Sequence, residues 1–447
     1  MNYTAYEEQV MERLRARNQN QPEFLQAVEE ILADVREEIE SNETYYQHNI
    51  LERLTEPDRV ISFLVCWEDD SGFPRVNRGW RVQHSNLIGP YKGGLRFHPS
   101  VNESVFKFLA FEQTFKNALT GLPIGGAKGG SDFNPRECSD REIMRFCQSF
   151  MNELYRHIGD KIDIPAGDIN VGNREIGYLF GQYRRLANTF SGVLTGKDLD
   201  FGGSHVRLEA TGFGLVYFVE KALARINQSI ENKVIAVSGS GNVALHAALK
   251  SIQLGARVVT LSSSKGTLLL EDGFSEEDAR TLITLKGDST EKLKYLGKGE
   301  WLGGSTPWDI PCDIALPCAT QNELRKENAE CLVKNGCMLI AEGANMPCDN
   351  EALRIFEENR VQHVPGKASN AGGVALSALE MGQNASFSRR GFEELNNELR
   401  AIMTRIHELA VESDPNATDE YVNYRRGANI AAFKRVGHAM VLQGIGS

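Results

Sequence analysis

Three lysines in the first half of the chain lie in surroundings that favour chemistry over simple solvation. Lys92 stands in GPYKGGLRFHP and Lys128 in GGAKGG, where glycines leave the backbone open to a ligand. Lys116 stands in FEQTFKNAL, among apolar residues. Three cations that converge on one pocket would suit a small dianion such as a dicarboxylic acid. Burial and mutual repulsion would lower the pKa of one lysine, which could then transfer protons near neutral pH. For each lysine alone, a solvated surface position is the ordinary alternative.

An aspartate offers a partner for such a lysine. Asp168 stands in IPAGDINVG, a stretch of apolar and glycine residues. A carboxylate beside a lysine of lowered pKa supplies the basic and acidic groups that a proton relay needs. The alternative is a turn-forming aspartate that hydrogen-bonds its own backbone.

A second kind of chemistry is indicated by GSGNVA, which spans Gly239 to Ala244. It follows the apolar run VIAVS and opens a helical pattern, which is the context of a dinucleotide-binding turn. The glycines let the backbone approach a pyrophosphate, which then lies at the positive end of the helix. A tight turn without a ligand is the alternative.

The next expected strand, RVVTL, runs into Ser262, Ser263, Ser264 and Lys265. Proteins that bind NAD usually place Asp or Glu here, on the ribose 2′-hydroxyl. Hydroxyl groups and a lysine instead suit the 2′-phosphate of NADP, which a carboxylate would repel. A solvated turn is again the alternative.

These residues need elements to position them, and the hydrophobic pattern of the first half predicts mixed α/β structure. The glycine-dense stretch 122–130 is expected to interrupt regular structure. Helices are expected at 24–39, 105–119 and 141–157, and a β-hairpin from 60–67 and 75–83.

From about residue 202 the pattern changes to alternating helices and short apolar runs, as in a doubly wound parallel sheet. After residue 375 the chain reads as mostly helical. Expected helices lie at 211–225 and from the GSGNVA motif to 254, and expected strands at 234–238, 257–261, 313–317, 338–341 and 361–364.

Composition narrows the functional classes. The 447 residues are 41% hydrophobic and 24% charged, which is ordinary for a soluble globular protein, and 447 residues are enough for two domains. The net charge of −11 disfavours nucleic acid and acidic membranes as partners. No apolar run is long enough to cross a membrane, so we expect a cytoplasmic protein. The eight cysteines form no C-x-x-C pair, so no metal is expected.

Taken together, the motifs GPYKGGLRFHP, FEQTFKNAL, GGAKGG, PAGDI, TGFG, SGSGNVA, PCATQNEL, AEGANMP and NAGGVALSALEM resemble, in this order, the hexameric glutamate dehydrogenases of the Glu/Leu/Phe/Val dehydrogenase family. The resemblance covers nearly the whole chain and is greatest to the short NADP-dependent form. It implies an α/β fold with a substrate-binding and oligomerisation domain (1–201), a Rossmann-type doubly wound dinucleotide-binding domain (202–373) and a C-terminal helical segment (374–447) that packs back on the first domain.

The resemblance also implies roles for individual residues. Lys128 matches the catalytic lysine and Asp168 its proton-transferring partner. Lys92 and Ser377 match the pair that holds the side-chain carboxylate of the substrate, while Gln113 and Lys116 match groups near its α-carboxylate and α-amino end. Other matched substrate positions are Gly167, Arg207 and Val374. Matched cofactor positions are Thr211, Gly239, Ser240, Gly241, Asn242, Val243, Ser263, Lys265, Lys286, Ala319, Thr320, Asn345 and Asn370. Ser263 departs from the acidic residue usual after the second strand, and Leu208 stands where the family has proline.

The implied reaction converts L-glutamate, water and NADP into 2-oxoglutarate, ammonium and NADPH in a homohexamer. Three alternatives stay open at this point: the same reaction with NAD, a dehydrogenase of apolar amino acids, and a non-catalytic dinucleotide sensor. Lys92 argues against apolar substrates, because an unpaired buried cation would reject an aliphatic side chain. The combination of Lys128 and Asp168 argues against a sensor, which needs neither group.

Overall fold

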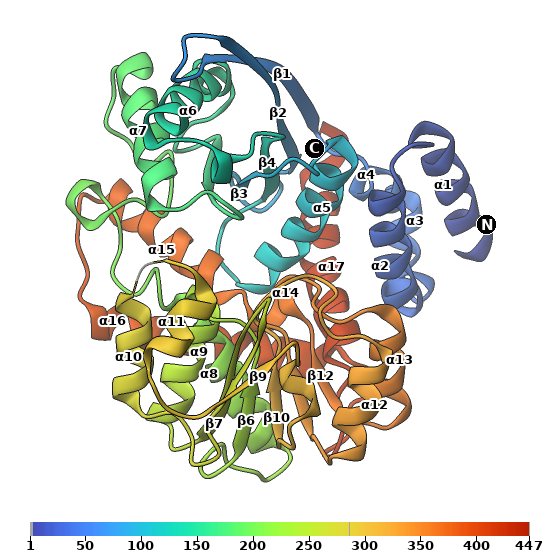
Figure 1. Cartoon of the computed structure of the whole chain (residues 1–447). Coiled ribbons are helices and arrows are strands. Elements are labelled where there is room, and N and C mark those ends of the chain that lie inside the picture. The colour runs from blue at the N-terminus through green and yellow to red at the C-terminus, as the bar shows by residue number, and fades with distance from the viewer. Residues whose placement is uncertain (1–2, 286, 447) are drawn as a thin grey trace. The chain divides into compact units, whose positions relative to one another are not determined.

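A computed structural model describes residues 3–285 and 287–446, and the chain divides into two compact units. Unit 1 contains Met1–His205, Val374–Leu395 and Asn429–Ser447, and unit 2 contains Val206–Gly373 and Asn396–Ala428. Figure 1 follows the chain through both units by colour. Whether the domains end at residues 201 and 373, as expected from the sequence, stays a prediction.

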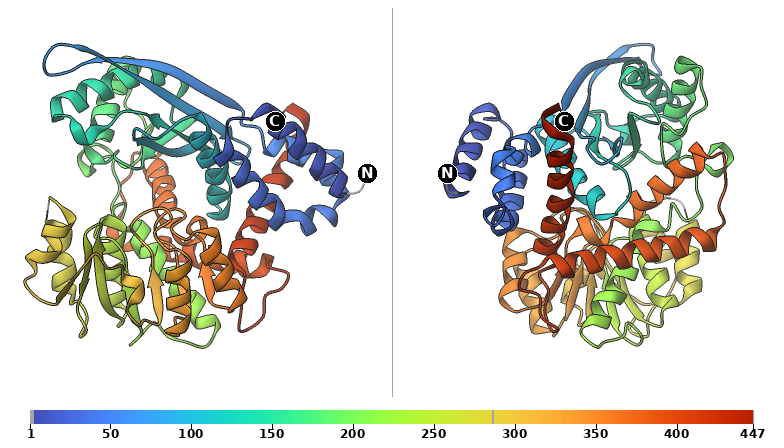
Figure 2. Two further views of the ribbon diagram at one scale, coloured as in Figure 1. Left: turned by 45° about the vertical axis from the view of Figure 1, so that its right-hand side comes forward. Right: turned by 180° about the vertical axis from the view of Figure 1, so that it is seen from behind.

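Unit 1 is built on a five-stranded mixed sheet of order β1-β2-β4-β3-β5. The expected hairpin is confirmed, because β1 and β2 pair in antiparallel register with Cys66 opposite Val76. Figure 2 shows it as a long ribbon. Strand β4 lies antiparallel to β2 and parallel to β3, and β5 lies parallel to β3. The strands are β1 (Arg59–Glu68), β2 (Pro74–Ser85), β3 (Tyr91–Phe97), β4 (Gly126–Ser131) and β5 (Asp163–Gly167).

The prediction that residues 122–130 interrupt regular structure was wrong for β4, which lies inside the sheet. Its glycines mark close packing. A Cβ atom at Gly126 would collide with Thr114, one at Gly129 would lie 2.5 Å from the Trp80 carbonyl oxygen, and one at Gly130 would collide with the Arg96 carbonyl. Glycine is therefore required by the approach of neighbouring groups and does not break the strand here.

The N-terminal part of unit 1 contains seven of its described helices, of which those at residues 103–119, 140–154 and 173–187 pack against the sheet. The predicted helix after Pro22 is confirmed as α2, whose apolar stripe, including Phe24 and Val28, is buried. Helix α6 begins at a capping box formed by Ser139 and Glu142. These helices are α1 (Tyr3–Arg17), α2 (Pro22–Glu40), α3 (Glu43–Gln47), α4 (Ile50–Leu54), α5 (Glu103–Leu119), α6 (Asp140–Leu154) and α7 (Asn173–Ala187).

Unit 2 contains a seven-stranded sheet of order β12-β11-β10-β6-β7-β8-β9. The five strands expected from the sequence run parallel, and the chain adds two antiparallel strands at one edge, β8 and β9, that the sequence pattern did not reveal. The strands are β6 (Val234–Val237), β7 (Arg257–Ser263), β8 (Gly266–Leu269), β9 (Glu300–Gly303), β10 (Ile314–Leu316), β11 (Leu339–Ala341) and β12 (Gln362–Val364).

Helices lie on both faces of this sheet, as a doubly wound fold requires. Figure 1 shows α9 and α10 on one side and α12 and α13 on the other. Within residues 206–373, the described helices of unit 2 are α8 (Ala210–Arg225), α9 (Asn242–Gln253), α10 (Glu276–Thr284), α11 (Ser289–Tyr295), α12 (Lys326–Lys334), α13 (Asn350–Glu358) and the single turn α14 (Gly366–Ser369).

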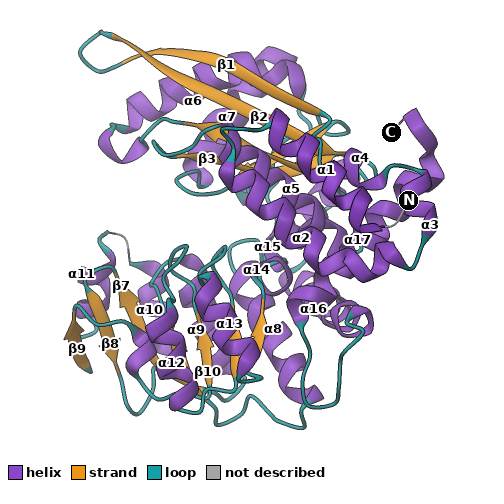
Figure 3. Cartoon of the chain, turned by 90° about the vertical axis from the view of Figure 1, so that its right-hand side faces the viewer, coloured by secondary structure: helices purple, strands orange, loops and turns teal. Residues whose placement is uncertain are grey.

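The end of the chain is helical, as predicted, with α15 (Gly372–Ala385), α16 (Phe392–Ser413) and α17 (Tyr424–Gln443) visible in Figure 3. The last residues belong to unit 1 and contact its N-terminal helices. Asn429 donates a 2.7 Å hydrogen bond to Asp34, and Arg53 donates one of 2.8 Å to the Gly444 carbonyl. Among the described residues, no helix is long and apolar enough to span a membrane.

Candidate active site

The centre of unit 1 contains a three-membered charge cluster of Lys128, Asp168 and Arg96. Lys128 Nζ lies 3.1 Å from Asp168 Oδ1, and Arg96 Nε donates a 2.7 Å hydrogen bond to Asp168 Oδ2. The exposed fractions of the three side chains are 6%, 14% and 11%, so the cluster is largely withdrawn from water. The structure thus brings together the lysine and the aspartate that the sequence singled out and adds an arginine.

Parallel strands position this cluster. Lys128 lies on β4, Arg96 on β3, and Asp168 directly follows β5, so each group comes from one of three adjacent strands. Gly94 of β3 makes the approach of Asp168 possible, because a Cβ atom at residue 94 would lie only 2.8 Å from Asp168 Cβ. The glycines around the lysines thus have a steric role in this sheet.

Burial and charge act on the cluster in opposite directions. Burial lowers the pKa of Lys128 below its ordinary value, Asp168 opposes this shift, and the Arg96 cation adds to it. Burial would raise the pKa of Asp168, but Lys128 and Arg96 outweigh burial and hold that pKa well below its usual range. When Lys128 loses its proton, Asp168 loses one of its two opposing cations and becomes a better proton acceptor.

Lys92 is a buried cation on β3, with only 1% of the residue exposed. Its ammonium group donates a 2.9 Å hydrogen bond to the Thr195 hydroxyl, and its backbone carbonyl accepts one of 3.1 Å from Asn117. The surface position considered for this lysine is therefore wrong. Buried lysines are rare, and a cation held by a neutral hydroxyl can pair with an anionic ligand group.

Helix α5 carries the other two residues expected to bind substrate in this region. Gln113 and Lys116 are half-buried and three positions apart, which places them on one side of the helix. Gln113 donates a 2.7 Å hydrogen bond to Asn117 Oδ1. A Cβ atom at Gly93 would lie 3.3 Å from Gln113 Cγ, so this glutamine packs beside the strand that carries Lys92.

Ser377 and Val374 lie three positions apart on α15, and both belong to unit 1. Ser377 is buried. One turn further along the helix, Glu380 forms a fully buried 2.8 Å ion pair with Lys197, which anchors α15 in the unit. Gly167 ends β5 immediately before Asp168, and a Cβ atom there would collide with the Val171 carbonyl.

In unit 2 the glycine-rich turn between β6 and α9 has the geometry of a phosphate cradle. Gly239 has φ +86°, which favours glycine, and its N–H donates a 2.8 Å hydrogen bond to Ser262 on β7. Gly241 directly precedes α9. The N–H groups of Asn242 and Val243 therefore lie in the first turn of this helix. The buried Ser240 hydroxyl has no hydrogen-bond partner among the described residues. A dinucleotide phosphate fits a turn with these donors.

The end of β7 is more complex than the sequence indicated. Ser263 Oγ lies 2.8 Å from Thr290 Oγ1 on α11 and accepts a 3.2 Å hydrogen bond from the Lys265 N–H. Lys265 Nζ lies 3.7 Å from Asp288 Oδ1, at the start of α11. A carboxylate is therefore close to the expected 2′-phosphate position, although it comes from another element.

Several further expected cofactor residues gather at the ends of β10 and β11. Asn370 donates 3.2 Å hydrogen bonds to Asn345 Oδ1 and to the Ala344 carbonyl. The N–H groups of Ala319 and Thr320 both donate to Glu323 Oε1, at 2.9 and 3.2 Å.

Three expected residues remain. Thr211 lies in the first turn of α8, and a Cβ atom at Gly373 would lie 2.5 Å from its hydroxyl. The same Cβ atom would lie 3.8 Å from Arg207, so these two residues flank one glycine. Lys286 lies outside the described residues.

The sequence reasoning missed four members of these clusters, namely Arg96, Thr195, Lys197 and Asp288. Of these four residues, only Arg96 could have been found from a pattern in the sequence. It lies four residues after Lys92 on one strand, and residues two and four apart in a strand point to the same face. The other three approach their partners from loops, whose paths the hydrophobic pattern does not reveal.

Comparison with known proteins agrees with this arrangement. Residues 202–444 match the model of the Glutamate/Leucine/Phenylalanine/Valine dehydrogenases, and residues 57–185 match the Glu/Leu/Phe/Val dehydrogenase dimerisation domain. The chain is 50% identical to the NADP-specific glutamate dehydrogenase of Escherichia coli over the full length of both, and 50% identical to the NAD(P)-specific glutamate dehydrogenase of Xylanibacter ruminicola over 98% of this chain and 99% of that protein.

A solved structure of Plasmodium falciparum glutamate dehydrogenase superposes with a TM-score of 0.96 at 48% identity, covering 99% of this chain and 95% of that one. Family models match both halves of the chain, and full-length relatives share half of its residues. The protein therefore belongs to the Glu/Leu/Phe/Val dehydrogenase family of amino-acid oxidoreductases.

Proposed function

We propose that the protein catalyses the reversible oxidative deamination of L-glutamate to 2-oxoglutarate and ammonium, with NADP as the preferred cofactor. The observation that carries the proposal is the 3.1 Å pair formed by the buried Lys128 and the carboxylate of Asp168, in a member of an amino-acid dehydrogenase family. Relatives of this chain named as glutamate dehydrogenases, at 50% identity over full length, support the same substrate.

The groups in the cluster can carry out the proton transfers of this reaction. When bound, the nicotinamide would supply the acceptor for the hydride of the α-carbon, and glutamate whose amino group has first lost one proton would become an iminium ion. Neutral Lys128 takes a proton from the water that adds to this iminium, and its ammonium form then stabilises the carbinolamine oxygen. Asp168 carries protons to and from the departing amino group. Arg96 holds Asp168 in place throughout.

Glutamate is favoured over apolar amino acids by the buried Lys92. Its ammonium group has a neutral hydroxyl partner in Thr195, so a substrate carboxylate would add a charge-assisted bond. An aliphatic side chain could make no such bond with this buried ammonium group and would still desolvate it, which is unfavourable. Ser377 offers a hydroxyl on α15 as a second group for the same carboxylate.

The preference for NADP rests on Ser263 and Lys265 at the end of β7, where no carboxylate follows the strand directly. A lysine and hydroxyls attract a 2′-phosphate. Asp288 shares the charge of Lys265 and limits this preference, because it would repel the phosphate and could accept a bond from the ribose hydroxyl of NAD. We therefore propose a preference for NADP and not absolute exclusion of NAD.

We further propose that the protein assembles as a homohexamer. The outward face of the hairpin exposes Leu64 and Val76, with 61% and 62% of their surfaces accessible, on an edge strand and its neighbour. An apolar face at a sheet edge is a natural site for pairing with a second copy of the chain. The match of residues 57–185 to a dimerisation domain supports this role.

One assay tests the proposed reaction. Formation of reduced nicotinamide, followed by absorbance, is measured with glutamate or norleucine and with NADP or NAD. We expect rapid reduction with glutamate and NADP, and slower reduction in the other combinations. Faster turnover of norleucine than of glutamate would show that the enzyme prefers apolar amino acids. Dinucleotide binding without any turnover would indicate a sensor.

A further inference from the structure

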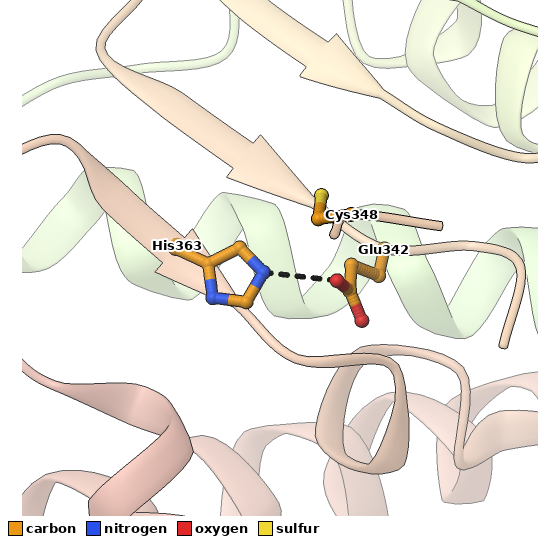
Figure 4. Close-up of side chains that lie close together, drawn as sticks. All are labelled: Glu342, Cys348 and His363. Carbon is orange, nitrogen blue, oxygen red and sulfur yellow. Dashed lines mark hydrogen bonds and ion pairs between the residues drawn. The ribbon is translucent and has the colours of Figure 1, made fainter. Parts of the chain in front are cut away.

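A second buried cluster in unit 2 consists of Glu342, Cys348 and His363, shown in Figure 4. One ligand-type atom from each residue lies within 4.8 Å of the others. His363 Nε2 lies 3.0 Å from Glu342 Oε1, and the thiol of Cys348 also interacts with Glu342. Glu342 and Cys348 are buried, whereas His363 is only partly so. None of the three has a role in the proposed reaction.

We propose that these three residues form a binding site for a divalent transition-metal ion of the zinc class. Thiolate, imidazole and carboxylate are the ligand types that zinc and cobalt(II) select. A thiolate and a carboxylate carry two negative charges, so a divalent ion with a neutral histidine gives a site of zero net charge. Charge balance matters here because an uncompensated charge in this interior would be costly.

The three ligands come from segments that meet at the ends of β11 and β12. Glu342 directly follows β11, His363 lies on the adjacent strand β12, and Cys348 precedes α13. The sequence spacing gave no sign of a metal site, because residues 342, 348 and 363 are brought together only by the pairing of β11 with β12. The loop between Glu342 and Cys348 carries Asn345, so a bound ion would hold both ends of a segment expected to contact the cofactor.

Metal binding would open the distance between His363 and Glu342 and would close any longer distance to the Cys348 sulfur, because the three ligand atoms lie up to 4.8 Å apart. In a tetrahedral zinc site, ligand atoms lie about 3.3 to 3.6 Å apart, given metal–ligand bonds of about 2.0 to 2.3 Å. The 3.0 Å separation of His363 and Glu342 would open slightly as the ion replaces the proton between them. The Gly366 N–H donates a 2.7 Å hydrogen bond to Glu342 Oε2, which orients the carboxylate and leaves Oε1 for the ion. Water can complete the fourth position.

Cys348 can bind the metal ion strongly only as a thiolate, so metal binding must displace the proton of its thiol. Burial and the neighbouring Glu342 carboxylate raise the pKa of the Cys348 thiol well above its ordinary value, which favours the protonated thiol. A metal ion reverses this preference, because it stabilises the thiolate directly. Without metal, the same three residues form a hydrogen-bonded network, which is the alternative that an experiment must exclude.

Titration of the full-length, thiol-reduced and metal-free protein with cobalt(II) tests the site. We expect one equivalent per chain and a sulfur-to-cobalt charge-transfer band in the near-ultraviolet, which zinc(II) removes by competition. Cys348→Ser and His363→Gln should each weaken cobalt binding at least tenfold, and Cys348→Ser should abolish the charge-transfer band.

Two other thiols serve as matched controls. Cys318 is buried in the same unit and Cys66 is exposed in the other, and neither belongs to the cluster. Cys318→Ser and Cys66→Ser should keep the band. Absence of a band in the wild-type protein, or its persistence in a folded Cys348→Ser variant, would overturn the proposal. If Cys348→Ser does not fold, unchanged cobalt affinity of His363→Gln would overturn it instead.

Discussion

Arg96 donates a 2.7 Å hydrogen bond to the carboxylate of Asp168, whose other oxygen lies 3.1 Å from the ammonium group of Lys128. One carboxylate is thus shared by two cations. Because the Arg96 cation lowers the pKa of Lys128 and also that of Asp168, this arginine acts on the acid–base chemistry through its neighbours. Arg96 is in this sense a positioning residue.

Replacement of Arg96 should shift the pH dependence of the reaction. In Arg96→Gln the pKa of Lys128 should rise, because a nearby cation has been removed. Deamination needs neutral Lys128 and increases as pH rises through its pKa, so the rising limb of the kcat profile should move to higher pH. Arg96→Lys should largely restore the limb, and Arg78→Gln, at an exposed arginine, should not move it. An unmoved limb in Arg96→Gln would remove Arg96 from this role.

Substrate choice should change at Lys92 and Ser377. The bond between Lys92 and a substrate carboxylate is worth roughly 1.5 to 3 kcal/mol, or about one to two factors of ten in kcat/KM. Lys92→Leu/Ser377→Val should lose at least this much with glutamate and should gain with norleucine relative to glutamate. Lys161→Leu, at an exposed lysine, is the control. A glutamate to norleucine ratio of kcat/KM unchanged within threefold would mean that another group holds the carboxylate.

Cofactor preference should respond in opposite directions to two substitutions. Ser263→Asp places a carboxylate against the 2′-phosphate, so it should weaken NADP binding and favour NAD. Asp288→Asn removes the carboxylate beside Lys265 and should strengthen NADP binding relative to NAD. Kd values for both cofactors measure the effect. Equal changes for NADP and NAD in either variant would place the discriminating position elsewhere.

Assembly should depend on the outward face of the hairpin. Leu64→Lys/Val76→Lys introduces charges on this face without preventing the two strands from pairing. The double variant should therefore have a lower molar mass by light scattering than the wild type. Leu208→Lys, at another exposed leucine, should leave the mass unchanged. A wild-type protein that is a stable, active monomer at micromolar concentration would contradict the proposed hexamer.

Much of the architecture could be predicted from the sequence, because local patterns determine it. The βαβ unit around Gly239 and the hairpin from Arg59 to Ser85 follow from the alternation of apolar runs and turn residues. Strand β4 was missed because a run of glycines has no hydrophobic pattern, and only the neighbours packed against Gly126 and Gly130 reveal why glycine is needed.

The candidate site could be predicted only in part. Lys92, Lys128 and Asp168 stood out by their unusual local surroundings. Their partner Thr195 is identified only by three-dimensional contact, whereas the spacing of Arg96 from Lys92 on one strand could have indicated that arginine. The carboxylate of Asp288 was missed because it reaches Lys265 from the loop before α11, more than twenty residues along the chain.

The most direct measurement of the central claim is the turnover of Lys128→Met, with Asp168→Asn beside it. Methionine fills a similar volume but takes no proton, so kcat with glutamate and NADP should fall by at least about 10²-fold, the lower range for general acid–base catalysis, while the Kd for NADP stays near its wild-type value. Asp168→Asn keeps the shape and should also lower kcat strongly. Wild-type kcat in Lys128→Met would contradict the assignment of this lysine as the catalytic base.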